Sequence, residues 1–184
     1  MRAMVLVLAA GLFPGMAQQG TEKASAAPVQ VKNSFEFEVR APLRDVAPLF
    51  GPEGERCWAG KHWDPVFVWP QPAKDVEGAV FTVQHGEHTS VWVDTVFDPG
   101  AGRMQYVAVV PGAMTFTVDV RLSAASSSVT KVDVTYTRTA LDTAANDDVM
   151  AMGKSDRANG PYWKKDIEGA LARGGAGKCM EAAK

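Results

Sequence analysis

The stretch Gly54-Glu-Arg-Cys-Trp-Ala-Gly-Lys-His-Trp-Asp-Pro-Val-Phe-Val-Trp-Pro70 holds three of the chain's five tryptophans within seventeen residues. Charged residues separate the indoles, and Pro52 and Pro70 bracket the stretch. Large aromatic side chains either close a hydrophobic core or line a binding site. The sequence patterns on both sides of the stretch help to distinguish these two interpretations.

Upstream of the stretch, the sequence predicts one strand followed by short helices. From Asn33 onward, Phe35, Phe37 and Val39 alternate with charged residues, which is the period-two pattern of a strand with one buried face. Residues 43–50 then place apolar side chains at helical spacing, and Pro48 limits any helix there to short pieces.

Downstream of the stretch, the sequence predicts six further strands. They cover residues 66–69, 79–84, 89–97, 103–110, 113–122 and 129–141. The breaks between them carry turn residues such as Glu77-Gly78 and Pro111-Gly112. Short connections of this kind join antiparallel neighbours, so we expect a seven-stranded meander.

A long helix is predicted after the last strand. Asn146 can cap it, and Asp147 and Asp148 suit its first turn. Gly160-Pro161 should kink or divide the helix, and Gly174-Gly175 should end it. Its apolar face comprises Val149, Met152, Trp163, Ile167, Ala170 and Leu171. A curved antiparallel sheet covered by one such helix is an α+β layer arrangement.

This order of elements resembles the START-like, polyketide cyclase/dehydrase and lipid-transport superfamily (SRPBCC), which has a helix-grip fold. Gly51-Pro-Glu-Gly-Glu-Arg-Cys-Trp58, followed by Trp63-Asp-Pro65 and Pro70, is similar to the opening motif of bacterial members. Val134-Thr-Tyr-Thr-Arg-Thr-Ala-Leu141 resembles their last strand, and the helix carrying Tyr162-Trp163 resembles their closing helix. The match covers residues 33–173, and residues 59–62 and the tail after Arg173 depart from the pattern. A fold shared so widely does not identify a reaction.

The first seventeen residues have the plan of a signal peptide. Arg2 precedes an apolar run from Met4 to Phe13, and small residues follow a Pro-Gly break. The run is too short to span a bilayer. We expect a periplasmic or secreted protein, or a cytoplasmic one if this segment is not a signal. Residues 18–32 are expected to be a disordered lead-in, residues 33–173 the domain and residues 174–184 a flexible tail.

Charge and cysteine content give further information on partners and compartment. Removing residues 1–17 takes away Arg2 and leaves 18 basic against 21 acidic residues. The basic residues are scattered and form no stripe with interleaved aromatics, which argues against nucleic-acid binding. Two cysteines are too few for a disulfide framework. Cys57 and Cys179 could form one bond in an oxidising compartment, or remain two free thiols.

In a helix-grip protein, the concave face of the sheet and the long helix enclose a cavity, so the resemblance implies that one parity of each strand points into it. The candidates are Trp92, Met104, Tyr106, Met114, Phe116, Val118, Tyr136, Met152 and Trp163. Such a lining is typical of a pocket for a hydrophobic small molecule. The same residues could instead simply fill the core.

The motif residues have a structural interpretation. Glu55 and Arg56 read as an ion pair at the surface or rim that holds a loop. Trp58 and Trp63, followed by Pro65, are expected to anchor the short helices and to form one wall of the cavity mouth.

The sequence offers no nucleophile motif and no carboxylate pair on an apolar strand, so no catalytic residue is predicted. A cyclase-type reaction would require Tyr106, Tyr136 or Arg138 to orient a poly-carbonyl substrate. His85, Glu87 and His88 could supply metal ligands, but a Gly-centred hairpin tip faces solvent and lacks HExxH spacing. We therefore predict neither a metal nor a cofactor.

Three functions remain open at this point. The first is an exported protein that binds a hydrophobic small molecule, either a lipid or an aromatic compound, without membrane insertion. The second is a cyclase, dehydrase or hydrolase acting in the same pocket. The third is an interaction module with a protein partner, which would require an exposed apolar patch. The oligomeric state is left open.

Overall fold

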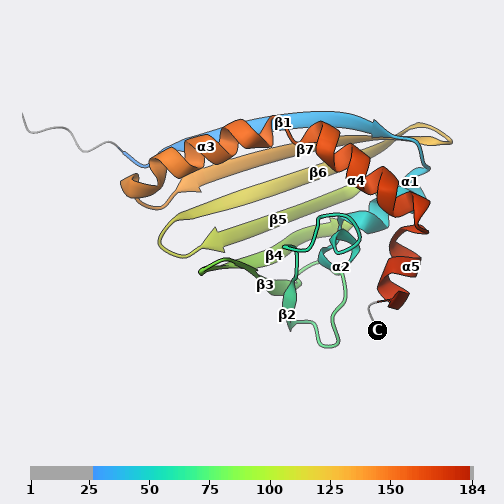
Figure 1. Ribbon diagram of the computed structural model, residues 1–184, viewed down its shortest axis with the longest axis horizontal. Coiled ribbons are helices and arrows are strands. Elements are labelled where there is room, and N and C mark those ends of the chain that lie inside the picture. Colours follow the sequence, from blue (N-terminus) through green and yellow to red (C-terminus); the bar gives the residue numbers. More distant parts are fainter. Residues whose placement is uncertain (1–26, 183–184) are drawn as a thin grey trace, which may run out of the picture.

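The computed structural model describes residues 27–182 of the chain. In that range, an antiparallel sheet of seven strands, in the order β1-β7-β6-β5-β4-β3-β2, curves around a group of helices (Figure 1). The strands are β1 (Gln30–Val39), β2 (Val66–Trp69), β3 (Val80–His85), β4 (His88–Asp98), β5 (Arg103–Val110), β6 (Met114–Ser126) and β7 (Val129–Ala140). The α+β helix-grip architecture expected from the sequence is confirmed.

The meander follows the predicted strands closely, and β5 has the predicted bounds. Two strands are clearly longer than predicted: β6 ends at Ser126 rather than at residue 122, and β1 begins at Gln30 and takes in residues 30–32 of the expected lead-in. These residues are ordered by pairing with the end of β7, where Gln30 lies opposite Thr139. The expected signal peptide and residues 18–26 lie outside the described residues.

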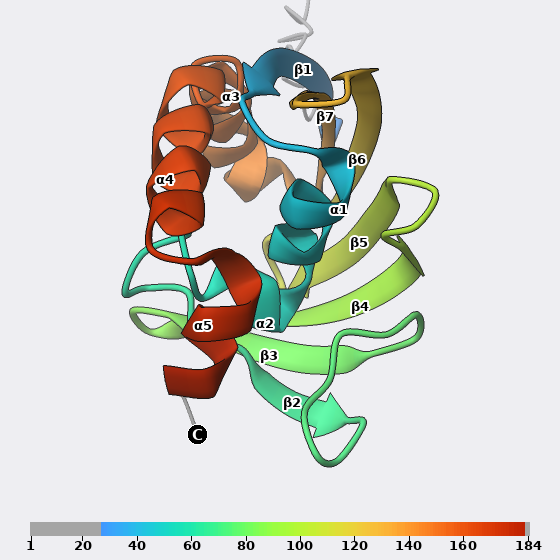
Figure 2. The same cartoon turned by 90° about the vertical axis from the view of Figure 1, so that its right-hand side faces the viewer.

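The helices stand on one side of the sheet, as Figure 2 shows from the end of the molecule. The first group is short: α1 (Leu43–Val46), the 3-10 helix η1 (Ala47–Phe50) and α2 (Pro52–Glu55). The second group is η2 (Thr143–Ala145), α3 (Asn146–Asp156), α4 (Gly160–Ala172) and α5 (Gly175–Ala182). The predicted long helix is divided between α3 and α4, because Pro161 opens α4.

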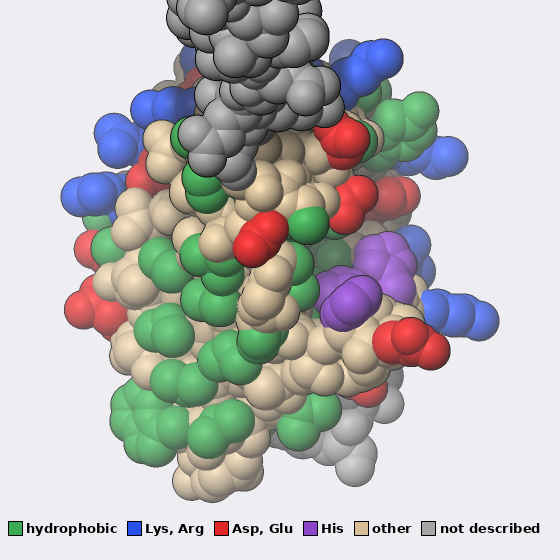
Figure 3. Space-filling view, turned by 90° about the vertical axis from the view of Figure 1, so that its left-hand side faces the viewer, with side chains coloured by type: hydrophobic (Ala, Val, Ile, Leu, Met, Phe, Trp, Pro, Cys, Tyr) green, Lys and Arg blue, Asp and Glu red, His purple; other side chains and the backbone are tan. Residues whose placement is uncertain are grey.

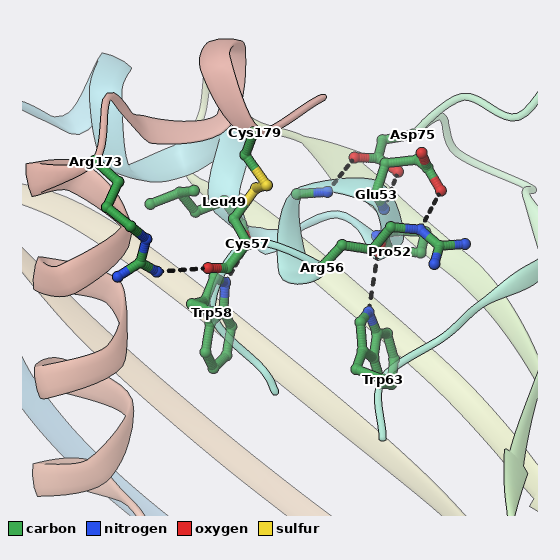
Figure 4. The surroundings of a disulfide bond; sticks show 11 residues. Leu49, Pro52, Glu53, Arg56, Cys57, Trp58, Trp63, Asp75, Arg173 and Cys179 are labelled. Atoms are coloured by element: carbon green, nitrogen blue, oxygen red, sulfur yellow. Dashed lines mark hydrogen bonds and ion pairs between the residues drawn. A yellow bond between two sulfur atoms is a disulfide. The ribbon is translucent and has the colours of Figure 1, made fainter. Parts of the chain in front are cut away.

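Two expectations about these helices are corrected. Asn146 does not cap α3; its side-chain oxygen accepts a hydrogen bond from the Val29 backbone at 3.0 Å, which ties the start of β1 to the helix. The predicted flexible tail contains the helix α5. A disulfide between Cys57 and Cys179 holds α5 against the tryptophan-rich segment, across a sequence separation of 122 residues (Figure 4).

The core lies between the concave face of the sheet and the helices. Strand residues alternate between buried and exposed positions, so Phe81, Met104 and Val120 point inward. Val149 of α3 and Ile167 of α4 complete the core from the helix side, and both are fully buried. This arrangement places α4 directly over the segment that carries Trp58.

Candidate functional site

The segment from Gly51 to Trp63 is held in place by close backbone packing and by two indole hydrogen bonds. A side chain at Gly54 would place its Cβ 2.1 Å from the Pro48 carbonyl oxygen, so only glycine fits there. The indole nitrogen of Trp58 donates to the Leu49 carbonyl at 2.7 Å, and that of Trp63 donates to the Pro52 carbonyl at 2.9 Å (Figure 4). Both tryptophans therefore anchor the short helices, as expected.

The same two indoles form part of a cavity of about 340 Å³ between the sheet and α4. Its mouth lies between residues 59–63 and the exposed side of α4, where Tyr162 and Asp166 stand. Seven aromatic side chains line it: Trp58, Trp63, Trp92, Tyr106, Tyr136, Tyr162 and Trp163. The tryptophan-rich stretch thus anchors the fold and lines a pocket at the same time.

The structure brings only some of the predicted pocket residues to this cavity. Trp92, Tyr106, Val118, Tyr136 and Trp163 line it. Met104, Met114 and Phe116 are buried elsewhere in the core and do not line the cavity. These three side chains provide packing, in agreement with the core-filling interpretation.

Met152 was expected in the pocket, but it faces solvent and the residue is 45% exposed. The buried residues of α3 are Val149, Gly153 and Asp156. Gly153 lies so close to β1 that a Cβ there would be 2.8 Å from atoms of Val31 and Asn33. Close packing at Gly153 turns the neighbouring Met152 toward solvent.

The aromatic walls of the cavity meet at steep angles. The rings of Trp63 and Trp92 are perpendicular, with centroids 5.2 Å apart. Trp58 and Trp163 meet at 61° with centroids 4.9 Å apart. Edge-to-face packing of this kind stabilises each pair.

The carboxyl groups of Glu55, Asp94 and Asp75 are close enough for their charges to affect one another, and one of the three reaches the cavity. Glu55 lines the cavity and is only 8% exposed. Asp94 is fully buried on the inward face of β4, opposite Tyr106 in the strand register, and neither of its carboxyl oxygens has a hydrogen-bond partner among the described residues. Asp75 accepts hydrogen bonds from the backbone of Glu53 at 2.8 Å and of Gly54 at 3.2 Å (Figure 4).

Burial has the largest effect on the pKa values of these three carboxyl groups. Burial, together with the charges of Asp94 and Asp75, raises the pKa of Glu55 well above its ordinary value. Burial and the charge of Asp75 raise the pKa of Asp94 to about 8. Burial also raises the pKa of Asp75 to about 6, although its two backbone hydrogen bonds oppose the shift. Burial therefore favours the protonated carboxyl at Glu55 and Asp94.

The two tyrosines beside this group stay protonated. The Tyr106 hydroxyl donates to the Phe50 carbonyl, and burial raises its pKa well above the ordinary value. Burial likewise raises the pKa of Tyr136. Because the single Tyr106 proton is committed to Phe50, its oxygen can only accept a further hydrogen bond, for example from protonated Glu55.

Arg138 does not line the cavity and has a structural role instead. Its guanidinium donates to Asp156 at 2.7 and 2.8 Å and lies over the rings of Phe116 and Tyr136, 4.7 and 4.8 Å from their centroids. The pair joins β7 to the end of α3. Its charge is neutralised by Asp156, so the orienting role considered for Arg138 has no geometric support.

The expected ion pair between Glu55 and Arg56 is wrong. Arg56 donates to Glu53 at 2.9 Å (Figure 4) and also pairs with Asp64 and the Pro65 carbonyl, whereas Glu55 lines the cavity. Adjacent residues on a short helix point in different directions, so neighbours in sequence need not pair. Arg56 therefore stabilises the loop through Asp64 and Pro65, and the Glu55 side chain lines the cavity instead of pairing with Arg56.

A larger hollow of about 640 Å³ lies on the outer side of the same loop. It shares Trp58, Trp63 and Asp166 with the cavity, but its other residues include Arg56, Lys61, Lys165 and Arg173. Arg173 donates to the Cys57 carbonyl at 3.0 Å beside the disulfide. This hollow is a charged, open approach, and the smaller aromatic cavity is the better candidate site.

The histidines do not form a metal site in the described part of the chain. His85 and His88 face each other across the β3–β4 hairpin and are exposed, and histidine side chains, purple in Figure 3, lie at the surface. Within residues 27–182, no cluster of three His, Cys, Asp or Glu side chains could hold a metal ion.

No protein-family model matches the chain, and no curated protein matches it. Solved structures resemble its fold. A truncated norcoclaurine synthase from Thalictrum flavum gives a TM-score of 0.58 at 9% identity, covering 79% of this chain and 96% of that one. Ara h 8.0201 gives 0.58 at 17% identity, covering 78% and 99%. An uncharacterised protein from Rhizobium leguminosarum gives 0.56 at 16%, covering 80% and 97%. At these identities the likeness establishes the fold alone.

Proposed function

We propose that this chain is a START-like binding protein that holds a small aromatic molecule in the cavity between the sheet and α4. The observation that carries the proposal is the lining, in which seven of thirteen residues are aromatic. Aromatic side chains offer large contact area with little conformational freedom to lose, which is how small-molecule pockets are usually built.

The volume of the cavity limits the size of the ligand. Its volume of about 340 Å³ lies near the lower end of the range for small-molecule sites, which is roughly 300 to 1,000 Å³. A compound with one or two rings fits this space, and a two-chain lipid does not. A related fold can hold such compounds: one norcoclaurine synthase structure contains dopamine and hydroxybenzaldehyde.

Binding can be tested with a neutral fluorescent aromatic probe, N-phenyl-1-naphthylamine, and with a variant that fills the cavity. Val118 lies between Tyr106 and Tyr136 in the strand register and lines the cavity. Val118→Phe should abolish probe binding while the protein stays folded by circular dichroism. Val91→Phe, on the exposed outer face of β4, is the matched control and should bind like the wild type. Probe binding that survives Val118→Phe would contradict the proposal.

A second candidate function is catalysis in the same cavity, and the buried carboxyl of Glu55 beside Tyr106 favours it. A carboxyl group with a raised pKa next to a bound molecule can act as a general acid. Once a ligand is identified, mass spectrometry of the recovered compound decides the matter. A converted product that disappears with Glu55→Gln would support an enzyme, and unchanged ligand would support a binding protein.

We also propose export from the cytoplasm. The disulfide between Cys57 and Cys179 fits an oxidising compartment, and no helix within residues 27–182 is long and apolar enough to cross a membrane. N-terminal sequencing of the protein from its source should find Gln18 as the first residue. A mature protein beginning at Met1 would contradict export through the predicted signal peptide.

A further inference from the structure

We propose that the cavity selects an organic cation, with its ammonium group against the indole walls and neutralised by Glu55. This inference rests on the proposed binding function and names the chemical class of the ligand. The charges around the cavity, the arrangement of its rings and a similar contact elsewhere in the same protein support it.

The cavity lining contains two carboxyl groups that a ligand cation could neutralise. Glu55 lies at the inner end and Asp166 at the mouth, while neither lysine nor arginine is among the lining residues in the part of the chain that the structure describes. Arg56 pairs with Glu53 and Asp64, and Arg138 pairs with Asp156, while Lys61 and Lys165 line the outer hollow and not the cavity. The carboxyl group of Glu55 therefore has no cationic partner from the described residues.

The buried carboxyl groups point to a missing partner. Asp94, on the inward face of β4, is fully buried with both oxygens unpartnered among the described residues, and its charge acts on Glu55 of α2. Unpartnered buried carboxyl groups are costly and rare in folded proteins. A ligand cation entering beside Glu55 would offset this cost, because its positive charge stabilises the ionised form of the group.

The aromatic walls suit the same ligand. The face of an indole ring attracts a cation, and several rings at steep angles surround it as a cage. Trp63 and Trp92 stand at 90°, and Trp58 and Trp163 stand at 61°. Four indoles with one carboxyl group at the inner end make an enclosure for an ammonium group attached to an apolar body.

The protein already contains this type of contact. The Arg138 guanidinium lies over the rings of Phe116 and Tyr136 and is neutralised by Asp156, which has a side-chain exposure of 3%. In the cavity, the ligand cation would lie between indole rings and Glu55. This arrangement is similar to that of the Arg138 guanidinium between its two aromatic rings and Asp156.

Binding of such a cation should release a proton. Burial raises the pKa of Glu55, and a cation beside it favours the ionised form, so the affinity should rise with pH. The groups that face it are Asp94 from β4, Asp75 from the loop before β3, Tyr106 from β5 and Tyr136 from β7, with Asp166 and His62 at the mouth.

The test compares probes of similar shape and different charge by isothermal titration calorimetry. Benzyltrimethylammonium and 2-phenylethylamine carry a positive charge, 2-phenylethanol is neutral and phenylacetate is negative. We expect both cations to bind at least about ten-fold more tightly than 2-phenylethanol, and phenylacetate to bind least. The wild-type comparison needs no variant, so it stands even if a substitution disturbs folding.

Glu55→Gln then separates charge from shape. Glutamine resembles a protonated carboxyl group, so the variant should fold. It should lose about ten-fold in affinity for benzyltrimethylammonium and much less in affinity for 2-phenylethanol. Glu87→Gln, on the exposed hairpin tip, removes one negative charge outside the cavity and should change neither affinity.

The proton balance gives an independent readout. Benzyltrimethylammonium has no proton to lose, so any proton released on binding comes from the protein. Titrations in buffers of different ionisation enthalpy at about pH 6 should show release of up to about one proton in the wild type and less in Glu55→Gln.

The outcomes distinguish the two proposals. If 2-phenylethanol binds as tightly as the cations, or if Glu55→Gln keeps the preference for cations, the cation inference is overturned while the cavity function stands. If none of these probes and no neutral aromatic binds the wild type, the proposed function fails and the inference fails with it.

Discussion

The indole rings of Trp58 and Trp163 meet edge to face, with their centroids 4.9 Å apart. Trp58 belongs to the segment between the short helices and β2, and Trp163 belongs to α4. Trp163 also packs against Phe35 of β1 and Tyr136 of β7. A single side chain of α4 therefore joins the tryptophan-rich segment to two strands, and it closes one wall of the cavity.

Removing this side chain should destabilise the protein as well as open the cavity. Trp163→Ala deletes a large, mostly buried ring, so we expect the free energy of unfolding to fall by about 3 kcal/mol. Tyr162→Ala is the control on the same helix, since Tyr162 is 66% exposed and should cost less than about 1 kcal/mol. Urea denaturation measures both, and equal losses would contradict the role given to Trp163.

The disulfide should contribute to stability through the long loop that it closes. Cys57 and Cys179 are separated by 122 residues, so the bond restricts the unfolded chain strongly. We expect Cys57→Ser with Cys179→Ser to lower the free energy of unfolding by about 3 kcal/mol. A reducing agent should destabilise the wild type by a similar amount and leave the double variant unchanged. Wild-type protein that titrates with two free thiols when denatured without reductant would contradict the bond.

The buried Asp94 should make stability depend on pH. Its pKa is about 8 in the folded protein, above the ordinary value of 3.8, so the folded state holds this proton more tightly than the unfolded state. The resulting stabilisation is complete below about pH 4 and is lost as the pH rises through about 8. Asp94→Asn cannot ionise, so it should gain in stability relative to the wild type between pH 4 and pH 8, by up to about 5 kcal/mol.

The comparison needs a control that removes a charge at the surface. Glu77→Gln changes an exposed residue and should leave the pH dependence of unfolding as in the wild type. Denaturant unfolding at several pH values from 4 to 9 supplies the measurement. Identical pH profiles for the wild type and Asp94→Asn would mean that Asp94 is not protonated by burial.

The Arg138–Asp156 pair should behave as a buried unit. The side chains are 12% and 3% exposed, so Asp156→Ala leaves an uncompensated cation between two rings and should cost about 3 kcal/mol. Combining it with Arg138→Met removes that cation, and the double variant should lose less than the sum of the two single variants. Additive losses in thermal or urea unfolding would show that the pair is not coupled.

The sequence predicted the fold well because its main signals are local. Alternation of Phe35, Phe37 and Val39 predicted β1, and the Gly160-Pro161 pair predicted the division between α3 and α4. The bond between Cys57 and Cys179 stayed open because spacing alone cannot show that two distant segments meet. The helix α5 was missed because the glycines at its start predict an end rather than a beginning.

The candidate site was predicted in part. Alternation along the strands placed Trp92, Tyr106 and Tyr136 correctly, but it could not distinguish the cavity from the core, so Met104 and Phe116 were included as well. Asp94 could have been found, since it shares the inward parity of Trp92 on β4. Asp75 gave no such signal, because it lies in a loop and its position depends on tertiary packing around α2.

The most direct test of the account uses the five indole N–H signals in a heteronuclear NMR titration. Trp58, Trp63, Trp92 and Trp163 line the cavity, whereas Trp69 does not line it and is 53% exposed on β2, so the protein carries its own control. Addition of 2-phenylethylamine should shift the four cavity signals along one saturable curve and leave the Trp69 signal in place. Shifts confined to Trp69, or no saturable shift at any of the four, would contradict the assignment of this cavity as the binding site.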